Sequence, residues 1–185
     1  MTQSSHRPDR LDVRSFAQDA AQLSGTLLLS KLERLAQDLY LVDADLASKT
    51  LQWEASGRSV PISGGAAQPW LHLKISLHAP MQCQRCLSAV EMPVEIARDF
   101  RFVKNEEEAN AQDDDAEEEL LVTSKQFNLL ELIEDEVIMA LPFAPVHEVC
   151  PVAVKLASSS EEFEEALVAK PNAFAALGVL KKAKP

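Results

Sequence analysis

The clearest pattern in the chain is the alternation of apolar and polar residues between positions 71 and 102. In residues 71–78, leucine and isoleucine alternate with histidine, lysine and serine. Residues 90–102 repeat this two-residue period, with Arg98 as the single charged position on the apolar face. Because successive side chains of a strand point to opposite faces, both stretches predict half-buried strands. We expect their apolar sides in the core of the domain, with Leu73, Ile75, Val94 and Ile96 among the core residues.

Shorter runs predict further strands earlier in the chain. Residues 26–29 indicate a short strand that leads into a helical turn beginning at Lys31. Residues 40–46 and 51–55 alternate in the same way and indicate half-buried strands. A loop rich in proline and glycine separates these runs from the strand that begins at residue 71.

Residues 128–141 carry the strongest helical pattern. Asn128 is a favourable N-cap, Glu131 stands in the capping-box position, and Pro142 ends the helix. At 3.6 residues per turn, one apolar stripe forms along the helix. We therefore expect this stripe to pack in the core through Leu130, Ile133 and Val137.

Leu132 and Met139 fall on a second apolar edge of this helix, outside the main stripe. Burial of the helix on two sides would explain such an edge. A groove that receives a partner would also explain it, and both interpretations stay open at this point.

Together these elements predict an α+β fold, in which an antiparallel sheet, open or partly closed, is covered by one main helix. The 185 residues are enough for one domain with a core. We expect a flexible N-terminal segment at residues 1–22 and a single domain at residues 23–150. Residues 151–185 are expected to form a C-terminal tail with short helices.

Most of the net charge of −11 comes from one short tract. Nine acidic residues lie between positions 106 and 119, and removing them would leave a charge of −2. A block of like charges repels itself, so we expect residues 105–118 to form a disordered, exposed loop. Such a loop could serve solubility alone, or it could bind a basic partner such as a ribosomal protein.

The three cysteines of the chain suggest a metal site. Cys83 and Cys86 have CxxC spacing between the two clearest strands, so we expect them at a hairpin turn that joins these strands. His147 and Cys150 have HxxC spacing after the helix. Together these four residues would supply a Cys3His set for zinc. Two alternatives are reduced cysteines that pack near a turn, and thiol redox chemistry. Redox chemistry is the weaker of these, because thioredoxin-like CxxC pairs open a helix that lowers the thiol pKa.

No catalytic site is evident in the sequence. The chain contains no phosphate-binding loop, no GxSxG motif and no dinucleotide-binding fingerprint. His72 and His78 lie on the expected outer face of a strand. We therefore predict a protein that is not an enzyme and has no small-molecule substrate. The polar N-terminus and the absence of long apolar runs favour a cytoplasmic protein without membrane contact.

Three segments, taken in order, resemble the YceD family, which is named for large ribosomal RNA subunit accumulation. They are CQRCL at 83–87, FNLLELIEDEVIMALPFAPVHEVC at 127–150 and KPNAFAALGVLKK at 170–182. The resemblance implies a bacterial factor needed for normal amounts of large-subunit (23S) ribosomal RNA. It also favours zinc near the end of the helix, although only His147 and Cys150 are available there. It implies no catalytic residues.

Two mechanisms are consistent with this resemblance. In the first, the protein docks on a ribosomal protein or a pre-ribosome through the acidic loop and the helix, with Arg85, Leu132 and Met139 as candidate contacts. In the second, it binds the large-subunit RNA precursor directly. The net acidity argues against this second mechanism, since phosphate neutralisation supplies most RNA affinity. The candidate RNA-binding residues are Lys74, Arg85, Arg101 and Lys104. A zinc or thiol sensor is a third possibility.

Overall fold

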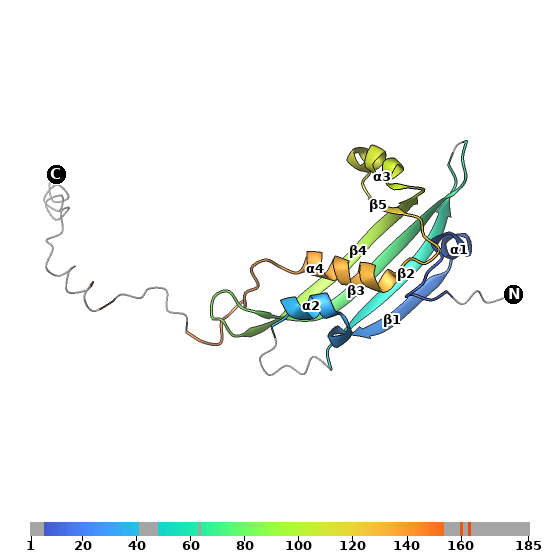
Figure 1. Cartoon of the computed structure of the whole chain (residues 1–185). Coiled ribbons are helices and arrows are strands. Elements are labelled where there is room, and N and C mark those ends of the chain that lie inside the picture. The colour runs from blue at the N-terminus through green and yellow to red at the C-terminus, as the bar shows by residue number, and fades with distance from the viewer. Residues whose placement is uncertain (1–5, 41–47, 63, 154–159, 161–162, 164–185) are drawn as a thin grey trace, which may run out of the picture. The chain divides into compact units, whose positions relative to one another are not determined.

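A five-stranded sheet forms the centre of the protein (Figure 1). The computed structural model describes residues 6–40, 48–62, 64–153, 160 and 163. The strand order is β1-β2-β3-β4-β5; the first four strands pair antiparallel and β5 pairs parallel to β4. The predicted α+β class is confirmed, and the sheet of the described residues is open. The strands are β1 (Gln22–Leu28), β2 (Thr50–Val60), β3 (Gln68–Gln82), β4 (Ala89–Val103) and β5 (Glu119–Val122).

The two longest strands, β3 and β4, form the hairpin that the alternating pattern predicts. Leu73 pairs with Arg98, Ile75 with Ile96, and Leu77 with Val94, so these side chains share one face of the sheet. Every apolar member of this group is buried. The inner face of the hairpin is therefore core, as expected, and Arg98 is its one charged position.

Helix α4 (Leu129–Ala140) covers this inner face, as Figure 1 shows. The side chain of Asn128 accepts hydrogen bonds from the N–H groups of Leu130 and Glu131, which confirms the predicted N-cap. Ile133 and Val137 are fully buried, whereas Leu130 is only partly buried against the core. The helix is thus rotated slightly from the expected orientation, so that Leu129 and Leu132 also enter the core.

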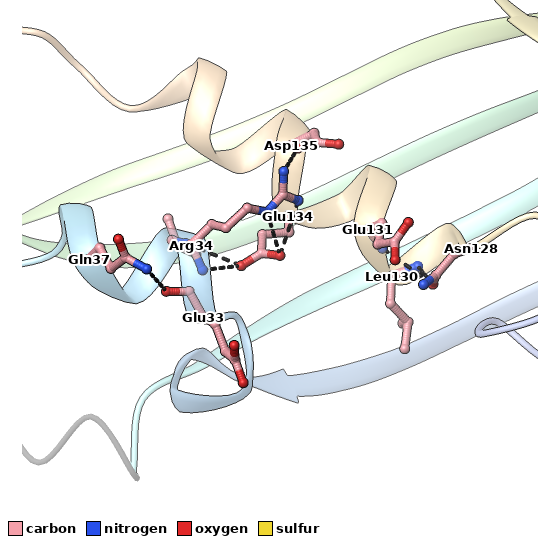
Figure 2. A network of polar contacts seen from close by, with 9 residues as sticks. Glu33, Arg34, Gln37, Asn128, Leu130, Glu131, Glu134 and Asp135 are labelled. Carbon is pink, nitrogen blue, oxygen red and sulfur yellow. Dashed lines mark hydrogen bonds and ion pairs between the residues drawn. The ribbon is translucent and has the colours of Figure 1, made fainter.

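Helix α2 (Glu33–Asp38) lies beside α4 on the same face and is attached to it through Glu134 (Figure 2). A 3-10 turn at Leu29–Lys31 leads into α2. Leu32, which precedes the helix, offers no side-chain cap. Instead, the carboxylate of Glu134 accepts hydrogen bonds from the N–H groups of Arg34 and Leu35 at 2.9 and 3.2 Å. A side chain of one helix thereby caps the start of the other.

The N-terminal segment is packed on the domain, in contrast to the predicted flexible stretch. Helix α1 (Val13–Gln18) is capped by Asp12, and its Val13 and Phe16 side chains are buried. Leu11 is also buried and exchanges two backbone hydrogen bonds with Phe127, at 2.7 and 2.9 Å. The prediction of a flexible segment is wrong for residues 6–22, because a few apolar side chains among polar neighbours suffice to anchor them.

The acidic tract also differs from the prediction. Helix α3 (Glu106–Gln112) begins at Asn105, whose side chain accepts from the N–H of Glu108, and a 3-10 turn follows at Asp113–Asp115. Ala109 is buried against the fold, while the carboxylates stay at the surface. The prediction of a disordered loop at 105–118 is therefore wrong. Acids in the first turn favour a helix through its dipole, which the charge-repulsion argument neglected.

Two predictions fall outside the described residues. A strand is expected at residues 40–46, and the structure describes only residue 40 of it. Most of the C-terminal tail, with its expected short helices, lies beyond residue 153 and is likewise outside the described residues. The chain divides into two compact units, Met1–Val149 and Cys150–Pro185. The elements described above belong to the first unit.

Candidate metal centre

The CxxC cysteines lie in the turn that joins β3 to β4. The N–H of Cys83 donates to the carbonyl of Ser88 at 2.9 Å, which keeps the two chain segments paired at the base of the turn. The N–H of Leu87 donates to the carbonyl of Cys83, also at 2.9 Å, and closes the turn. The sequence prediction that this motif occupies a hairpin turn is confirmed by the ends of β3 and β4.

The segment that follows α4 lies against this turn. Pro142 comes two residues after the helix ends, and the chain then runs toward the β3–β4 hairpin (Figure 1). The N–H of Gln84 donates to the carbonyl of Pro145 at 2.8 Å. The guanidinium of Arg85 donates to the carbonyl of His147 at 2.9 Å. These bonds bring the HxxC motif to the CxxC turn across about 60 positions of sequence.

The four side chains that the spacing singled out lie together. One ligand atom from each residue, a cysteine Sγ or a histidine ring nitrogen, lies within 4.8 Å of all the others. A tetrahedral zinc ion with bonds of about 2.0–2.3 Å separates its ligand atoms by roughly 3.3–3.8 Å. The donor set therefore fits zinc in type and number, and the four ligand atoms are close enough to surround one ion after a small inward movement. The four residues, one buried and three half-buried, are Cys83, Cys86, His147 and Cys150.

The hydrogen bonds of His147 orient its ring for metal binding. Its Nε2 lies 3.0 Å from the carbonyl oxygen of Ala89, and a carbonyl oxygen can only accept. Nε2 must therefore carry the proton, which leaves Nδ1 as the free donor atom in the neutral ring. Nδ1 lies 3.4 Å from the Sγ of Cys86. A backbone carbonyl that fixes the tautomer of a histidine ligand is a usual outer-shell partner of zinc sites.

The same cluster favours a thiolate. Burial raises the pKa of the Cys83 thiol, but backbone hydrogen bonds from Cys86, His147 and Arg85 lower it, to about 5. The side chain of Cys83 in turn raises the pKa of His147 above its ordinary value. Cys83 is therefore ionised at neutral pH, which is the form that binds metals. Metal binding through Nδ1 requires the neutral form of the His147 ring, so metal affinity should fall as the ring becomes protonated.

Sequence reasoning did not find the groups that surround the four candidate ligands. The Ser88 hydroxyl lies 3.1 Å from the Sγ of Cys86, and the carbonyls of Ala89 and Pro145 position the two segments. A hydroxyl two residues after the CxxC motif is a weak signal by itself. Backbone carbonyls leave no signal in a sequence, because every residue carries one.

The three candidate partner contacts lie in different surroundings. Leu132 is 9% exposed and packs in the core, so its assignment as a partner contact is wrong, and burial explains its place on the second apolar edge of α4. Met139, on the same edge, is 57% exposed. Arg85 is exposed at the β3–β4 turn. A partner role for Met139 and Arg85 stays a prediction.

The four candidate RNA-binding residues do not converge. Arg85 lies in the turn at one end of the hairpin, whereas Arg101 and Lys104 lie at the other end of β4. With about 3.3 Å per residue, some 40 Å of strand separates the two ends. Arg101 also donates to the side chains of Glu118 and Gln112 and is largely covered. Lys74 lies on the outer face of β3, away from both ends.

The fold and the side-chain cluster define an α+β protein with a candidate Cys3His metal site at the tip of a long β-hairpin. Residues 71–181 match the family described as "Large ribosomal RNA subunit accumulation protein YceD". The chain belongs to this family. The match includes the hairpin, the acidic helix, α4 and all four candidate ligands, and it begins after β2.

A curated relative extends the similarity to the N-terminal third. The chain is 28% identical over 181 residues to the large ribosomal RNA subunit accumulation protein YceD of Haemophilus influenzae. The alignment covers 95% of this chain and 96% of that protein. No solved structure shows a significant match. Within the described part of the chain, no helix combines the length and the apolar character needed to cross a membrane.

Proposed function

We propose that this protein is a non-enzymatic factor of ribosome assembly that promotes the accumulation of large-subunit (23S) ribosomal RNA. The observation that carries the proposal is the family match over residues 71–181. The relative of nearly equal length bears the same description. That description refers to accumulation of an RNA and names no reaction. A cytoplasmic location follows from this role, since ribosome assembly in bacteria takes place there.

The charge distribution supports docking on a ribosomal protein or a pre-ribosome. Among the described residues, six acids of the α3 region make no ion pair: Glu106, Glu107, Asp113, Asp114, Asp115 and Glu117. They form an exposed negative surface that suits a basic partner and repels phosphate. Direct RNA binding is the alternative, and the separation of Lys74, Arg85, Arg101 and Lys104 weighs against it.

A charge-matched pair of variants tests the docking mechanism. Changing Asp113, Asp114 and Asp115 to asparagine removes three exposed charges from the acidic surface. The control changes Glu54, Glu95 and Glu131 to glutamine, which removes three exposed charges elsewhere. The tagged chains are purified from the native bacterium with and without nuclease, and the co-purified ribosomal proteins are quantified.

If the protein docks on a ribosomal protein, the native chain should still co-purify ribosomal proteins after nuclease treatment. The amount of these proteins should fall at least several-fold in the aspartate variant and stay unchanged in the glutamate control. Loss of all ribosomal proteins after nuclease treatment would instead support the RNA-binding alternative. A second measurement tests the role itself: deletion of the gene should lower the ratio of 23S to 16S RNA, and the native chain should restore it. An unchanged ratio would contradict the proposed function.

We also propose that zinc has a structural role in the Cys3His cluster. Cys83, Cys86, His147 and Cys150 would hold it, and it would fasten the segment after α4 to the β3–β4 turn. The support is the closeness of the four donors and the fixed tautomer of His147. Elemental analysis should give one zinc per chain, and the Cys83→Ser variant should lose it. His78→Ala, an exposed histidine outside the cluster, is the matched control and should keep full zinc.

A further inference from the structure

Leu87, in the turn between β3 and β4, combines an unfavourable backbone conformation with an exposed apolar side chain. Its φ of 62° lies in the left-handed region, which favours glycine and asparagine over leucine. Its side chain is nevertheless 61% exposed and adds little to the core. The other non-glycine residue at positive φ among the described residues is Ala20, whose side chain is minimal.

The fold needs the backbone of Leu87 but not its side chain. The N–H of Leu87 closes the turn on Cys83, and its carbonyl accepts from Gln82 Nε2 at 3.1 Å and from the Tyr40 hydroxyl at 3.4 Å. Glycine would make the same three hydrogen bonds without strain. Strain that serves no packing purpose is a sign of function, so the side chain of Leu87 requires another explanation.

Three further exposed apolar side chains lie beside this turn. Phe143 is 103% exposed, Val149 is 85% exposed and Val146 is 37% exposed. Each lies within two residues of Pro145 or His147, whose carbonyls are bonded to the turn at Gln84 and Arg85. Two residues span at most about 7 Å, so these side chains surround the same end of the hairpin as Leu87. We call Leu87, Phe143, Val146 and Val149 the tip patch.

The chemistry of the tip patch favours a protein over a nucleic acid. Three of its four side chains are aliphatic and offer no ring on which a base could stack. The turn itself contains one cation, Arg85, whose guanidinium already donates to the carbonyl of His147, and the exposed acid Glu148 lies in the segment that contacts the turn. RNA affinity depends on cations that neutralise phosphates, and the described residues at this end of the hairpin do not supply a group of them.

The tip patch is also poorly suited to bind a second copy of the chain. A stable association buries about 800 Å² on each partner. A large aromatic side chain contributes about 150–250 Å², so one phenylalanine and three smaller residues fall well short of that area. Residues 1–149 carry 13 basic and 25 acidic residues, a net charge of −12. This charge would oppose self-association and attract a basic partner.

We infer that the tip patch is a docking surface for a basic protein, and that Leu87 and Phe143 insert into an apolar pocket of that protein. The inference deepens the proposed function, on which it rests, by adding a second contact to the one made by the acidic surface. The two contacts lie at opposite ends of β4 and would engage the partner assembly together.

Leu87→Gly and Phe143→Ser test the inference, with Ile62→Ser as the matched control. Ile62 is 48% exposed in the loop that precedes β3, at the opposite end of that strand from the turn. Each purified chain is titrated against the protein fraction extracted from large ribosomal subunits of the same bacterium, and separately against naked 23S RNA. Melting temperature and zinc content are measured for every variant, and sedimentation reports self-association.

The expected result is that Leu87→Gly and Phe143→Ser bind the protein fraction at least tenfold more weakly than the native chain, whereas Ile62→Ser binds normally. Leu87→Gly should melt at the same or a higher temperature with unchanged zinc content, which separates a lost contact from a lost fold. Equal binding by native and tip-patch variants overturns this inference and leaves the proposed function intact. Failure of the native chain to bind the protein fraction overturns both. Binding to RNA alone, or self-association that Phe143→Ser abolishes, overturns the inference as well.

Discussion

Replacing Glu134 with alanine would remove the acceptor on which α2 begins. Figure 2 shows its carboxylate facing the first turn of α2. One oxygen accepts from the N–H groups of Arg34 and Leu35, and the other accepts from Arg34 Nε and Nη2 at 3.2 and 3.1 Å. Glu134 is only 8% exposed and Leu35 is fully buried, so water could not readily replace the lost acceptor.

The expected cost follows from these contacts. Loss of a helix N-cap costs about 1 kcal/mol. An unsatisfied N–H at the buried Leu35 adds about 1–3 kcal/mol. The guanidinium of Arg34 is half exposed, so solvent screens its ion pair and we assign no further loss to it. We therefore expect Glu134→Ala to lower the free energy of unfolding by about 3 kcal/mol.

Urea unfolding followed by circular dichroism measures this change. Asp135→Ala is the matched control, because Asp135 also pairs with Arg34 but is 48% exposed and caps no helix. The control should change stability by less than about 0.5 kcal/mol. Glu134→Gln keeps an oxygen for the two N–H groups and should fall between the other variants. A cost below about 1 kcal/mol for Glu134→Ala, or equal costs at positions 134 and 135, would refute the capping role.

Three further changes test other parts of the fold by the same unfolding assay. Gly57→Ala would place a Cβ 2.6 Å from the carbonyl oxygen of Phe16, so we expect a loss of about 1–3 kcal/mol; a neutral result would mean that α1 moves freely. Burial raises the pKa of Glu136, so its contribution to stability falls as the pH rises through the folded-state pKa. Glu136→Gln should thus gain stability relative to the native chain as the pH rises from about 4, the ordinary range of an unfolded glutamate, through the raised folded-state pKa, and an opposite slope would contradict this. Deleting residues 106–117 should cost more than the roughly 1 kcal/mol of a loop change, because Ala109 is buried, and a smaller loss would show that α3 is not structurally engaged.

The sequence patterns that predicted structure correctly were those with a single physical explanation. Two-residue alternation over β3 and β4 can only be satisfied by strands with one buried face. Asn128 and Pro142 mark the ends of α4 because a cap and a missing N–H act locally. The CxxC and HxxC motifs converge because β3 and β4 form a hairpin and α4 returns along it.

The predictions failed where tertiary contacts outweighed local composition. Leu11, Val13 and Phe16 lie among charged residues, and the contacts that anchor them, such as the pairing of Leu11 with Phe127, are made with residues far along the chain. The acidic tract forms a helix, and Arg101 holds its end through Glu118 and Gln112.

Arg98 was the one unexplained position on the apolar face of β4. In the structure its guanidinium lies 3.3 Å from the carboxylates of both Glu119 and the buried Glu136. The arginine of β4 therefore pairs with an acidic residue of β5 and with one of α4. Such a pairing needs three segments of chain, and no local pattern in the sequence can reveal it.

The bridge between Leu11 and Phe127 also bears on the order in which the chain can fold during synthesis. Strands β1 to β4 are sequential neighbours, so each can pair as soon as the next one has left the ribosome. Helix α1 cannot complete its docking until residue 127 is available, which is 116 positions after residue 11. At about 5–20 residues per second, the bridge has to wait roughly 6–23 seconds after Leu11 is added. For that interval the nascent chain lacks a main anchor for its first helix, and a chaperone could act on the apolar residues of that helix.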